Sequence, residues 1–377
     1  MRKGDTSTFN SSTYEKTAEE MRSRGEKVHD RAQQVFRETG QLDPLVNIFG
    51  KRRTSRNAFQ ENPDGTCTLT HGIKLPIFSG GDGTASMGEY LSLTFMSMKE
   101  LFGMFSALDR YQIDLSIGVL QDVDDEHAVF QMAEFESDNR AADHVRLLFP
   151  DKHGGDTPED YDLGLYYLDQ AVDTDIHFYG LKGYLFITAD SDGRGSVSPS
   201  DVKRHLGLDM QMIQSTKNIC QRLLEKWHFY LIQVKNNDEC TTWWTDKVGS
   251  SRVIRIDDGH LLDEVQSGLI YVTETLQPNR QGLEEFLRAG NTNQRISSYD
   301  IDRIWGWLQT ARIHFGAQAK LPGFDSIPKP GDIFAHYRDP WPIGHPRAGE
   351  NPSATGKTST PSTPPTPSPD PIPWDKL

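Results

Sequence analysis

The chain has 377 residues, of which 36% are hydrophobic and 25% are charged, so it is long enough for two ordinary domains or for one large α/β domain with extensions. Its formal net charge of −14 argues against a general nucleic-acid binder, because phosphate contacts require a basic face. The short basic run Lys51–Arg56 is the one local exception, and we expect it to be a solvated loop.

Cysteine usage and hydropathy indicate the compartment. The three cysteines, Cys67, Cys220 and Cys240, are odd in number and form no CxxC pair, which argues against a disulfide framework or a zinc site. The N-terminus lacks the apolar segment of a secretory signal, and no run of about 18 apolar residues would span a membrane. We therefore expect a cytoplasmic protein that binds neither membrane nor nucleic acid.

Residues 1–42 are predicted to form a flexible N-terminus followed by one amphipathic helix. From Tyr14 to about Thr39 the apolar positions fall near helical spacing in a charged background. They are Ala18, Met21, Val28, Ala32, Val35 and Phe36.

From residue 72 onward strands and helices alternate. Strands are expected at 72–78, 113–123, 127–135, 181–190, 228–234 and 252–256. Helices are expected at 90–108, 159–172, 210–227 and 260–276. This alternation predicts a doubly wound, mostly parallel sheet covered on both faces, and the short gap at 124–126 predicts a hairpin with one antiparallel edge strand.

The chain changes character after Thr275. Two accessory helices are expected at 280–290 and 299–315, with Ile301, Trp305 and Leu308 packing back on the body. From residue 341 the Pro/Ser/Thr bias predicts a disordered tail, either a spacer or a segment that docks its PIPWDKL end on a partner. The predicted units are thus 1–42, a domain at 43–276, a helical extension at 277–340 and the tail at 341–377.

The stretch IFSGGDGTASMGEY (Ile77–Tyr90) permits two interpretations. GGDGT resembles the phosphate loop of the NAD and diacylglycerol kinases, in which glycines let backbone N–H groups approach the phosphates. Those kinases also carry an Asn-Glu pair on a helix, whereas the nearest equivalent, Asn236–Glu239, follows a strand. This interpretation predicts a magnesium-dependent phosphotransferase or hydrolase.

The second interpretation uses Asp82, Thr84 and Ser86, which alternate on an extended loop and present their oxygens on one side. Carboxylate and hydroxyl oxygens suit Mg²⁺, and further ligands would come from other loops at the same edge of the sheet. No HExxH, GxSxG or GxxxxGK[ST] motif occurs, so no nucleophile is nominated. The aromatic pairs Trp243–Trp244 and Trp305–Trp307 are expected to serve packing.

DGTASMG is similar to the metal-ion-dependent adhesion site motif of von Willebrand factor A-type (vWA) domains. GGDTPEDYDLGLYYL resembles the vWA loop that carries a second-motif threonine, and KGYLFITAD resembles the fourth strand with its terminal aspartate. Together with SRNAFQ, QDV and QMAEFESDNR, these stretches resemble a bacterial and phage vWA group of unassigned role over about residues 43–276.

This resemblance implies a metal site and a function. The implied ligands of Mg²⁺, or of Mn²⁺ or Ca²⁺, are Asp82, Thr84, Ser86, Thr157 and Asp190, with Glu159 as an alternative to Thr157. A vWA module of this kind would be a binding adaptor rather than an enzyme, and its partner would present an Asp or Glu to the metal. Such proteins often work beside AAA+ ATPases or in bacterial and phage conflict systems.

Overall fold

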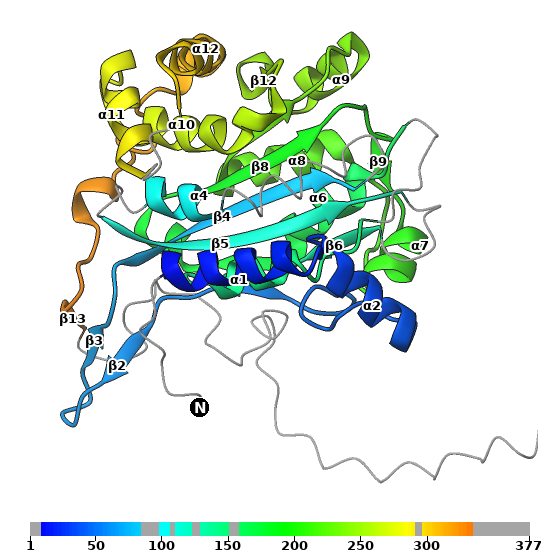
Figure 1. Cartoon of the computed structure of the whole chain (residues 1–377), viewed down its shortest axis with the longest axis horizontal. Coiled ribbons are helices and arrows are strands. Elements are labelled where there is room, and N and C mark those ends of the chain that lie inside the picture. The colour runs from blue at the N-terminus through cyan, green and yellow to red at the C-terminus, as the bar shows by residue number, and fades with distance from the viewer. Residues whose placement is uncertain are drawn as a thin grey trace, which may run out of the picture.

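The computed structural model describes residues 9–83, 98–105, 110–122, 129–150, 158–290 and 296–334. Its centre is a six-stranded sheet in the order β12-β11-β8-β4-β5-β6 (Figure 1). The strands are β4 (Ile73–Asp82), β5 (Tyr111–Leu120), β6 (Phe130–Met132), β8 (Gly183–Ala189), β11 (Trp227–Gln233) and β12 (Val253–Arg255). All neighbours pair in parallel except β5 and β6, so the predicted fold class, with one antiparallel edge strand, is confirmed.

Helices cover both faces of this sheet because its strands are apolar on both sides. Ile77 packs into one core with Leu101 and Val265, whereas the next residue, Phe78, packs into the other with Tyr161. The first core includes α4 (Met98–Phe105), α10 (Leu262–Glu274), α11 (Arg280–Gly290) and α12 (Ser298–Leu308). The second includes α6 (Tyr161–Ala171), α8 (Thr216–Lys226) and α9 (Asp238–Val248).

The single N-terminal helix expected from Tyr14 to Thr39 is wrong, because two helices occupy this segment. They are α1 (Ser11–Ser23) and α2 (Asp30–Thr39). Gly25 adopts φ 65°, a left-handed conformation that ends α1, and its N–H donates to the carbonyl of Arg22. The apolar spacing is continuous across the break because both helices pack against the same body, so periodicity alone does not reveal the turn.

The expectation of a solvated loop at Lys51–Arg56 is also wrong. Residues Arg53–Ser55 form β1, which pairs in parallel with β7 (Val172–Thr174). The Arg53 side chain is 1% exposed and forms an ion pair of 2.9 Å with Glu134. The remaining guanidinium donors reach main-chain carbonyls, those of Leu45, Asn47 and Met132. A charge is tolerated here because its donors are paired.

Shorter elements complete the described part of the chain. A three-stranded antiparallel sheet joins β2 (Phe59–Glu61), β3 (Cys67–Leu69) and β13 (Ile333–Phe334), and a two-stranded one joins β9 (Ser196–Val197) and β10 (Gln214–Ser215). Short helices are α5 (Arg140–Val145) and α7 (Pro199–Asp201), five 3₁₀ turns (Asp175–Tyr179, Ser250–Arg252, Gly259–Leu261, Gln309–His314 and Phe324–Ser326) and the π turn Val202–Leu206.

The C-terminal helices pack on α10, as the sequence predicts. Ile301 and Leu308 are fully buried, and Trp305 packs partly buried against the same core. No helix in the described ranges is both long and apolar enough to cross a membrane. The predicted tail at 341–377 lies outside the described residues, as does most of the helix predicted at 90–108, and the unit boundaries stay predictions.

Candidate metal centre

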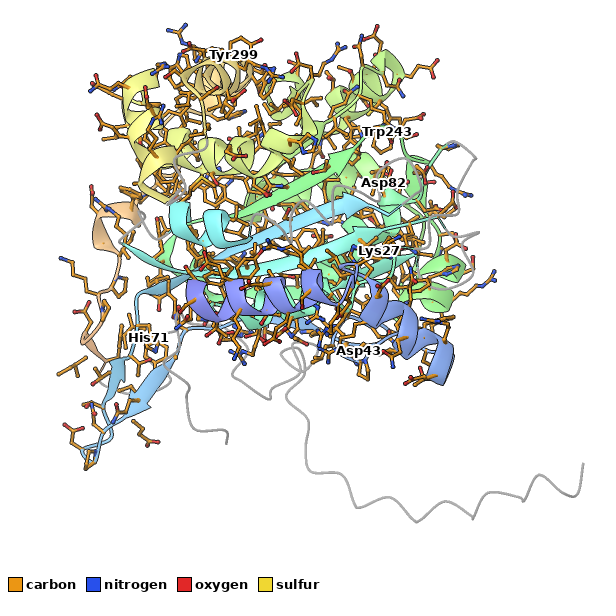
Figure 2. The ribbon with its side chains drawn as sticks, viewed as in Figure 1. Lys27, Asp43, His71, Asp82, Trp243 and Tyr299 are labelled. Atoms are coloured by element: carbon orange, nitrogen blue, oxygen red, sulfur yellow. The ribbon has the colours of Figure 1, made fainter. Side chains whose placement is uncertain are left out.

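Asp82 and Asp190 lie at the carboxyl ends of two adjacent parallel strands. Asp82 is the last residue of β4 and is only 1% exposed (Figure 2). Asp190 directly follows β8. The strand register pairs Gly81 with Thr188, so the two aspartates leave the sheet at neighbouring positions. This edge is where open α/β sheets bind ligands.

The Tyr161 hydroxyl donates a hydrogen bond of 2.6 Å to Oδ2 of Asp82. The pKa of Tyr161 is raised well above 10, first by burial and next by the charge of Asp82, and the charges of Glu159 and Asp190 raise it further. The phenol therefore stays protonated and fixes the Asp82 carboxylate.

The loop before α6 is fastened to the loop after β8. The backbone N–H of Glu159 donates to the carbonyl of Asp192 at 3.0 Å. Asp162, in the first turn of α6, accepts from the N–H of Arg194 at 2.8 Å and from the Thr216 hydroxyl, while burial raises its pKa. The two loops that the resemblance nominates for ligands are thus held side by side.

Three of the five predicted ligands, Thr84, Ser86 and Thr157, lie outside the described residues. Glu159, the alternative to Thr157, lies in the fastened loop. The structure therefore places Asp82 and Asp190 at the ends of adjacent parallel strands, and the choice between Thr157 and Glu159 remains open.

Two cations neutralise part of this acidic edge. The Lys235 ammonium lies 2.6 Å from Oδ2 of Asp190. The Arg194 guanidinium bridges Asp122 at 2.8 Å and Asp160 at 2.9 Å. Both contacts join loops that follow different strands, so they cross-link the edge as well as balancing its charge.

Helix α9 packs against the loop after β8. The Trp244 indole N–H donates to the carbonyl of Ser191 at 3.2 Å, and a Cβ atom at Gly193 would lie 2.7 Å from the Trp243 ring. The two rings meet edge to face with centroids 4.8 Å apart. The predicted packing role of this tryptophan pair is confirmed.

The donor atoms at this edge fit a hard divalent cation. Asp82 and Asp190 offer carboxylate oxygens. Burial raises the pKa of the nearby Cys240 thiol to about 12, and the charges of Asp190, Asp192 and Asp82 add to this rise. Within the described residues no group of three His, Cys, Asp or Glu side chains could hold a metal ion. A site here would therefore need the neutral hydroxyl ligands that the vWA resemblance supplies.

The first two glycines of GGDGT, Gly80 and Gly81, lie in the sheet. The predicted strand end at Phe78 is wrong, since β4 continues to Asp82 and Gly80 pairs with Gly118 on one side and Ile187 on the other. A Cβ atom on Gly80 would lie 2.7 Å from the Phe78 ring and 2.9 Å from Leu120. These glycines make room for packing within a central strand, whereas a phosphate loop needs them in an open turn.

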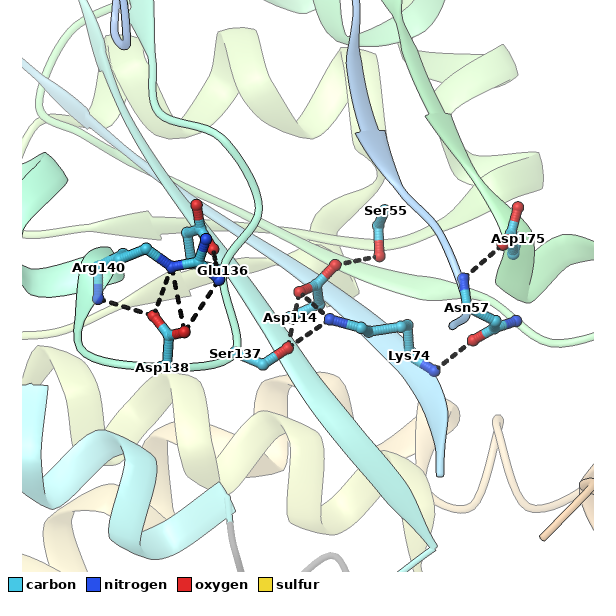
Figure 3. A network of polar contacts seen from close by, with 9 residues as sticks. All are labelled: Ser55, Asn57, Lys74, Asp114, Glu136, Ser137, Asp138, Arg140 and Asp175. Carbon is cyan, nitrogen blue, oxygen red and sulfur yellow. Dashed lines mark hydrogen bonds and ion pairs between the residues drawn. The ribbon is translucent and has the colours of Figure 1, made fainter. Parts of the chain in front are cut away.

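A second polar cluster, at the start of β4, involves the FESDNR run (Figure 3). The Lys74 ammonium lies 2.9 Å from Asp114 and donates to the Ser137 hydroxyl at 2.6 Å. Ser137 in turn donates to Asp114 at 2.9 Å, and Ser55 does so at 2.5 Å. Because the ammonium is ion-paired with a buried carboxylate, it is not a free base that would activate Ser137.

Sequence reasoning missed the residues that support the two aspartates. Tyr161 lies within the GGDTPEDYDLGLYYL stretch, where its place at the start of a helix behind an edge loop is a usable signal. Lys235 is 45 residues from Asp190, and only the knowledge that β11 lies beside β8 brings them together.

No protein-family model and no curated protein matches the chain. Solved structures similar to it include proximal thread matrix protein 1 from the mussel byssus (10% identity, 52% of this chain and 47% of that one, TM-score 0.35). A von Willebrand factor type A protein from Catenulispora acidiphila is 14% identical over 59% of this chain and 50% of that one, with a TM-score of 0.31. The pilus adhesin SpaC from Lactobacillus rhamnosus GG is 7% identical over 62% and 33%, with a TM-score of 0.36.

The chain therefore spans half or less of the length of these structures. Likenesses this slight decide neither fold nor function, which rest on the geometry of the chain itself.

Proposed function

We propose that this chain is a vWA-type module that binds another protein through a divalent cation held between Asp82 and Asp190. The observation that carries the proposal is the buried Asp82 carboxylate, fixed by the Tyr161 hydroxyl at 2.6 Å and adjacent to Asp190 at the carboxyl edge of the sheet. In the proposal Thr84, Ser86 and Thr157 complete the protein ligands of Mg²⁺, with Glu159 as the alternative to Thr157.

The composition of this ligand set suits the binding of a carboxylate from a partner protein. Two carboxylates and three neutral hydroxyls leave a divalent cation with residual positive charge and exchangeable water. An Asp or Glu of a partner protein can then complete the coordination shell. The chain would act as an adaptor in an intracellular complex, and an AAA+ ATPase assembly is the class of partner that the vWA resemblance suggests.

The protic groups near the aspartates favour binding over turnover. Tyr161 is kept protonated and already donates to Asp82, and the Cys240 thiol has a pKa of about 12. Neither group is available as a base or nucleophile near neutral pH. Gly80 and Gly81 pair inside β4 rather than lying in an open turn, which weighs against the kinase interpretation.

Affinity purification with mass spectrometry tests this function. Wild type should capture a partner with Mg²⁺, lose it in EDTA and recover it when Mg²⁺ is restored, whereas Asp82→Ala and Thr157→Ala should not capture it. Asp209→Ala, at an exposed aspartate outside the centre, is the matched control and should behave as wild type. If Thr157 is the ligand, Glu159→Ala should have the smaller effect.

Two results would contradict the proposal. One is a partner that binds equally well in EDTA and to Asp82→Ala. The other is Mg²⁺-dependent nucleotide or phosphoester turnover that disappears in Asp82→Ala, which would favour the phosphotransferase or hydrolase interpretation.

A further inference from the structure

We infer that Lys235 is a resident counter-ion of Asp190 that competes with the divalent cation and so lowers the affinity of the centre for metal. This inference rests on the proposed function, since it concerns the same site. It adds a residue that no vWA motif includes and assigns it control over metal loading.

The geometry places the ammonium on the predicted ligand. The Lys235 Nζ atom lies 2.6 Å from Oδ2 of Asp190, whose side chain is 12% exposed, while the lysine side chain is 48% exposed. Lys235 follows β11, and the register pairs Gln233 with Ala189, the residue before Asp190. A lysine at this point of the neighbouring strand therefore reaches Asp190 across the sheet edge.

The backbone that carries Lys235 is held in place by a buried side chain. Gln233 donates to the carbonyl of Lys235 at 2.8 Å and to that of Asn237 at 2.6 Å, and accepts from the Thr241 hydroxyl at 2.6 Å. Asn237 donates in turn to the carbonyl of Asp190 at 2.9 Å. The turn is fixed, whereas the lysine stem is flexible and half exposed, so the ammonium can withdraw without moving the main chain.

The ammonium and a divalent cation would compete for the Asp190 carboxylate. Without metal, the ammonium neutralises part of the negative charge at this edge, where Asp190 follows the strand beside the one that ends in Asp82. A divalent cation bound to the same carboxylate would meet a like charge within a few ångströms, so binding must displace the ammonium. Removing the lysine charge should therefore favour the metal-bound form, because the cation no longer has to displace the ammonium or bind beside it.

Calorimetric titration of Mn²⁺ into the EDTA-treated, dialysed full chain tests this competition. Lys235→Met should bind Mn²⁺ roughly tenfold more tightly than wild type, the scale of one lost like-charge interaction at a half-exposed site. Lys235→Arg keeps the charge and should bind no more tightly than wild type. Lys217→Met is the matched control, because Lys217 is 50% exposed and pairs with Asp246 at 2.7 Å, and it should leave the affinity unchanged.

Thermal melting gives an independent readout. The rise in melting temperature on adding Mn²⁺ should be larger for Lys235→Met than for wild type, with Lys235→Gln as a second variant should the first misfold. If both neutral variants bind Mn²⁺ with wild-type or weaker affinity, the competition is refuted while the metal centre stands. If wild type itself binds no Mn²⁺, the proposed function fails instead.

Discussion

Replacing Tyr161 with phenylalanine removes a single hydroxyl and keeps the ring in its core. The hydroxyl donates to the Asp82 carboxylate at 2.6 Å, and both side chains are buried. Because Asp82 loses a donor that water cannot easily replace there, the folded state should be destabilised. A hydrogen bond to a charged group contributes about 1.5–3 kcal/mol, so Tyr161→Phe should lower the free energy of unfolding by about that amount.

Urea denaturation in EDTA measures this loss without any contribution from bound metal. The same substitution in an Asp82→Asn background separates the charged hydrogen bond from packing. With a neutral acceptor, the hydroxyl should contribute only about 0.5–1.5 kcal/mol. The double-mutant cycle should therefore return a coupling energy of about 1 kcal/mol or more between positions 161 and 82.

An equal effect of Tyr161→Phe in both backgrounds would refute this reasoning. It would show that the phenol contributes through its ring alone and does not orient Asp82. A loss below about 0.5 kcal/mol in the wild-type background would contradict it as well, since a charged acceptor would then be stable without its donor.

Two further predictions concern buried charges. Burial raises the pKa of Glu274 from 4.5 to about 7, although Tyr184 donates to it at 2.8 Å and Tyr111 at 3.2 Å. The contribution of Glu274 to the free energy of unfolding is therefore full below pH 4.5 and is lost as the pH rises through 7. In urea titrations, Glu274→Gln should lose less stability than wild type between pH 5 and pH 7.5. If the stability difference between the two proteins does not change with pH, the raised pKa of Glu274 is contradicted. Arg53→Met should cost about 1–3 kcal/mol in the same assay, because three main-chain carbonyls lose their donor while Glu134, which is 38% exposed, can be solvated. A cost below about 1 kcal/mol would show that these carbonyls find water.

The sequence predicts the sheet well because a buried parallel strand is a continuous apolar run. The residues around Phe186 and Leu231 are apolar at nearly every position, and both runs form strands where expected. Gly80 misleads because glycine is common in loops, yet here it is required inside β4 by the neighbouring rings and side chains. Arg53 misleads because its burial depends on carbonyls supplied by distant segments.

The candidate metal centre likewise contains residues that the sequence identifies and residues that it does not. Asp82 and Asp190 can be nominated from sequence because each lies at or just after an apolar strand, and parallel strands deliver their carboxyl ends to one edge. Tyr161 and Lys235 are not predictable to the same degree, because their roles depend on which helix and strand lie beside those ends. Local pattern therefore identifies carboxylates at an edge, whereas the groups that orient and neutralise them depend on tertiary contacts.

Calorimetric titration of Mg²⁺ into wild type and Asp82→Ala, both stripped with EDTA, tests the central claim most directly. Wild type should bind one Mg²⁺ per chain, and Asp82→Ala should bind none while keeping its circular dichroism spectrum. Absence of binding by wild type at millimolar Mg²⁺, or unchanged binding by a folded Asp82→Ala, would contradict a metal centre at this edge of the sheet.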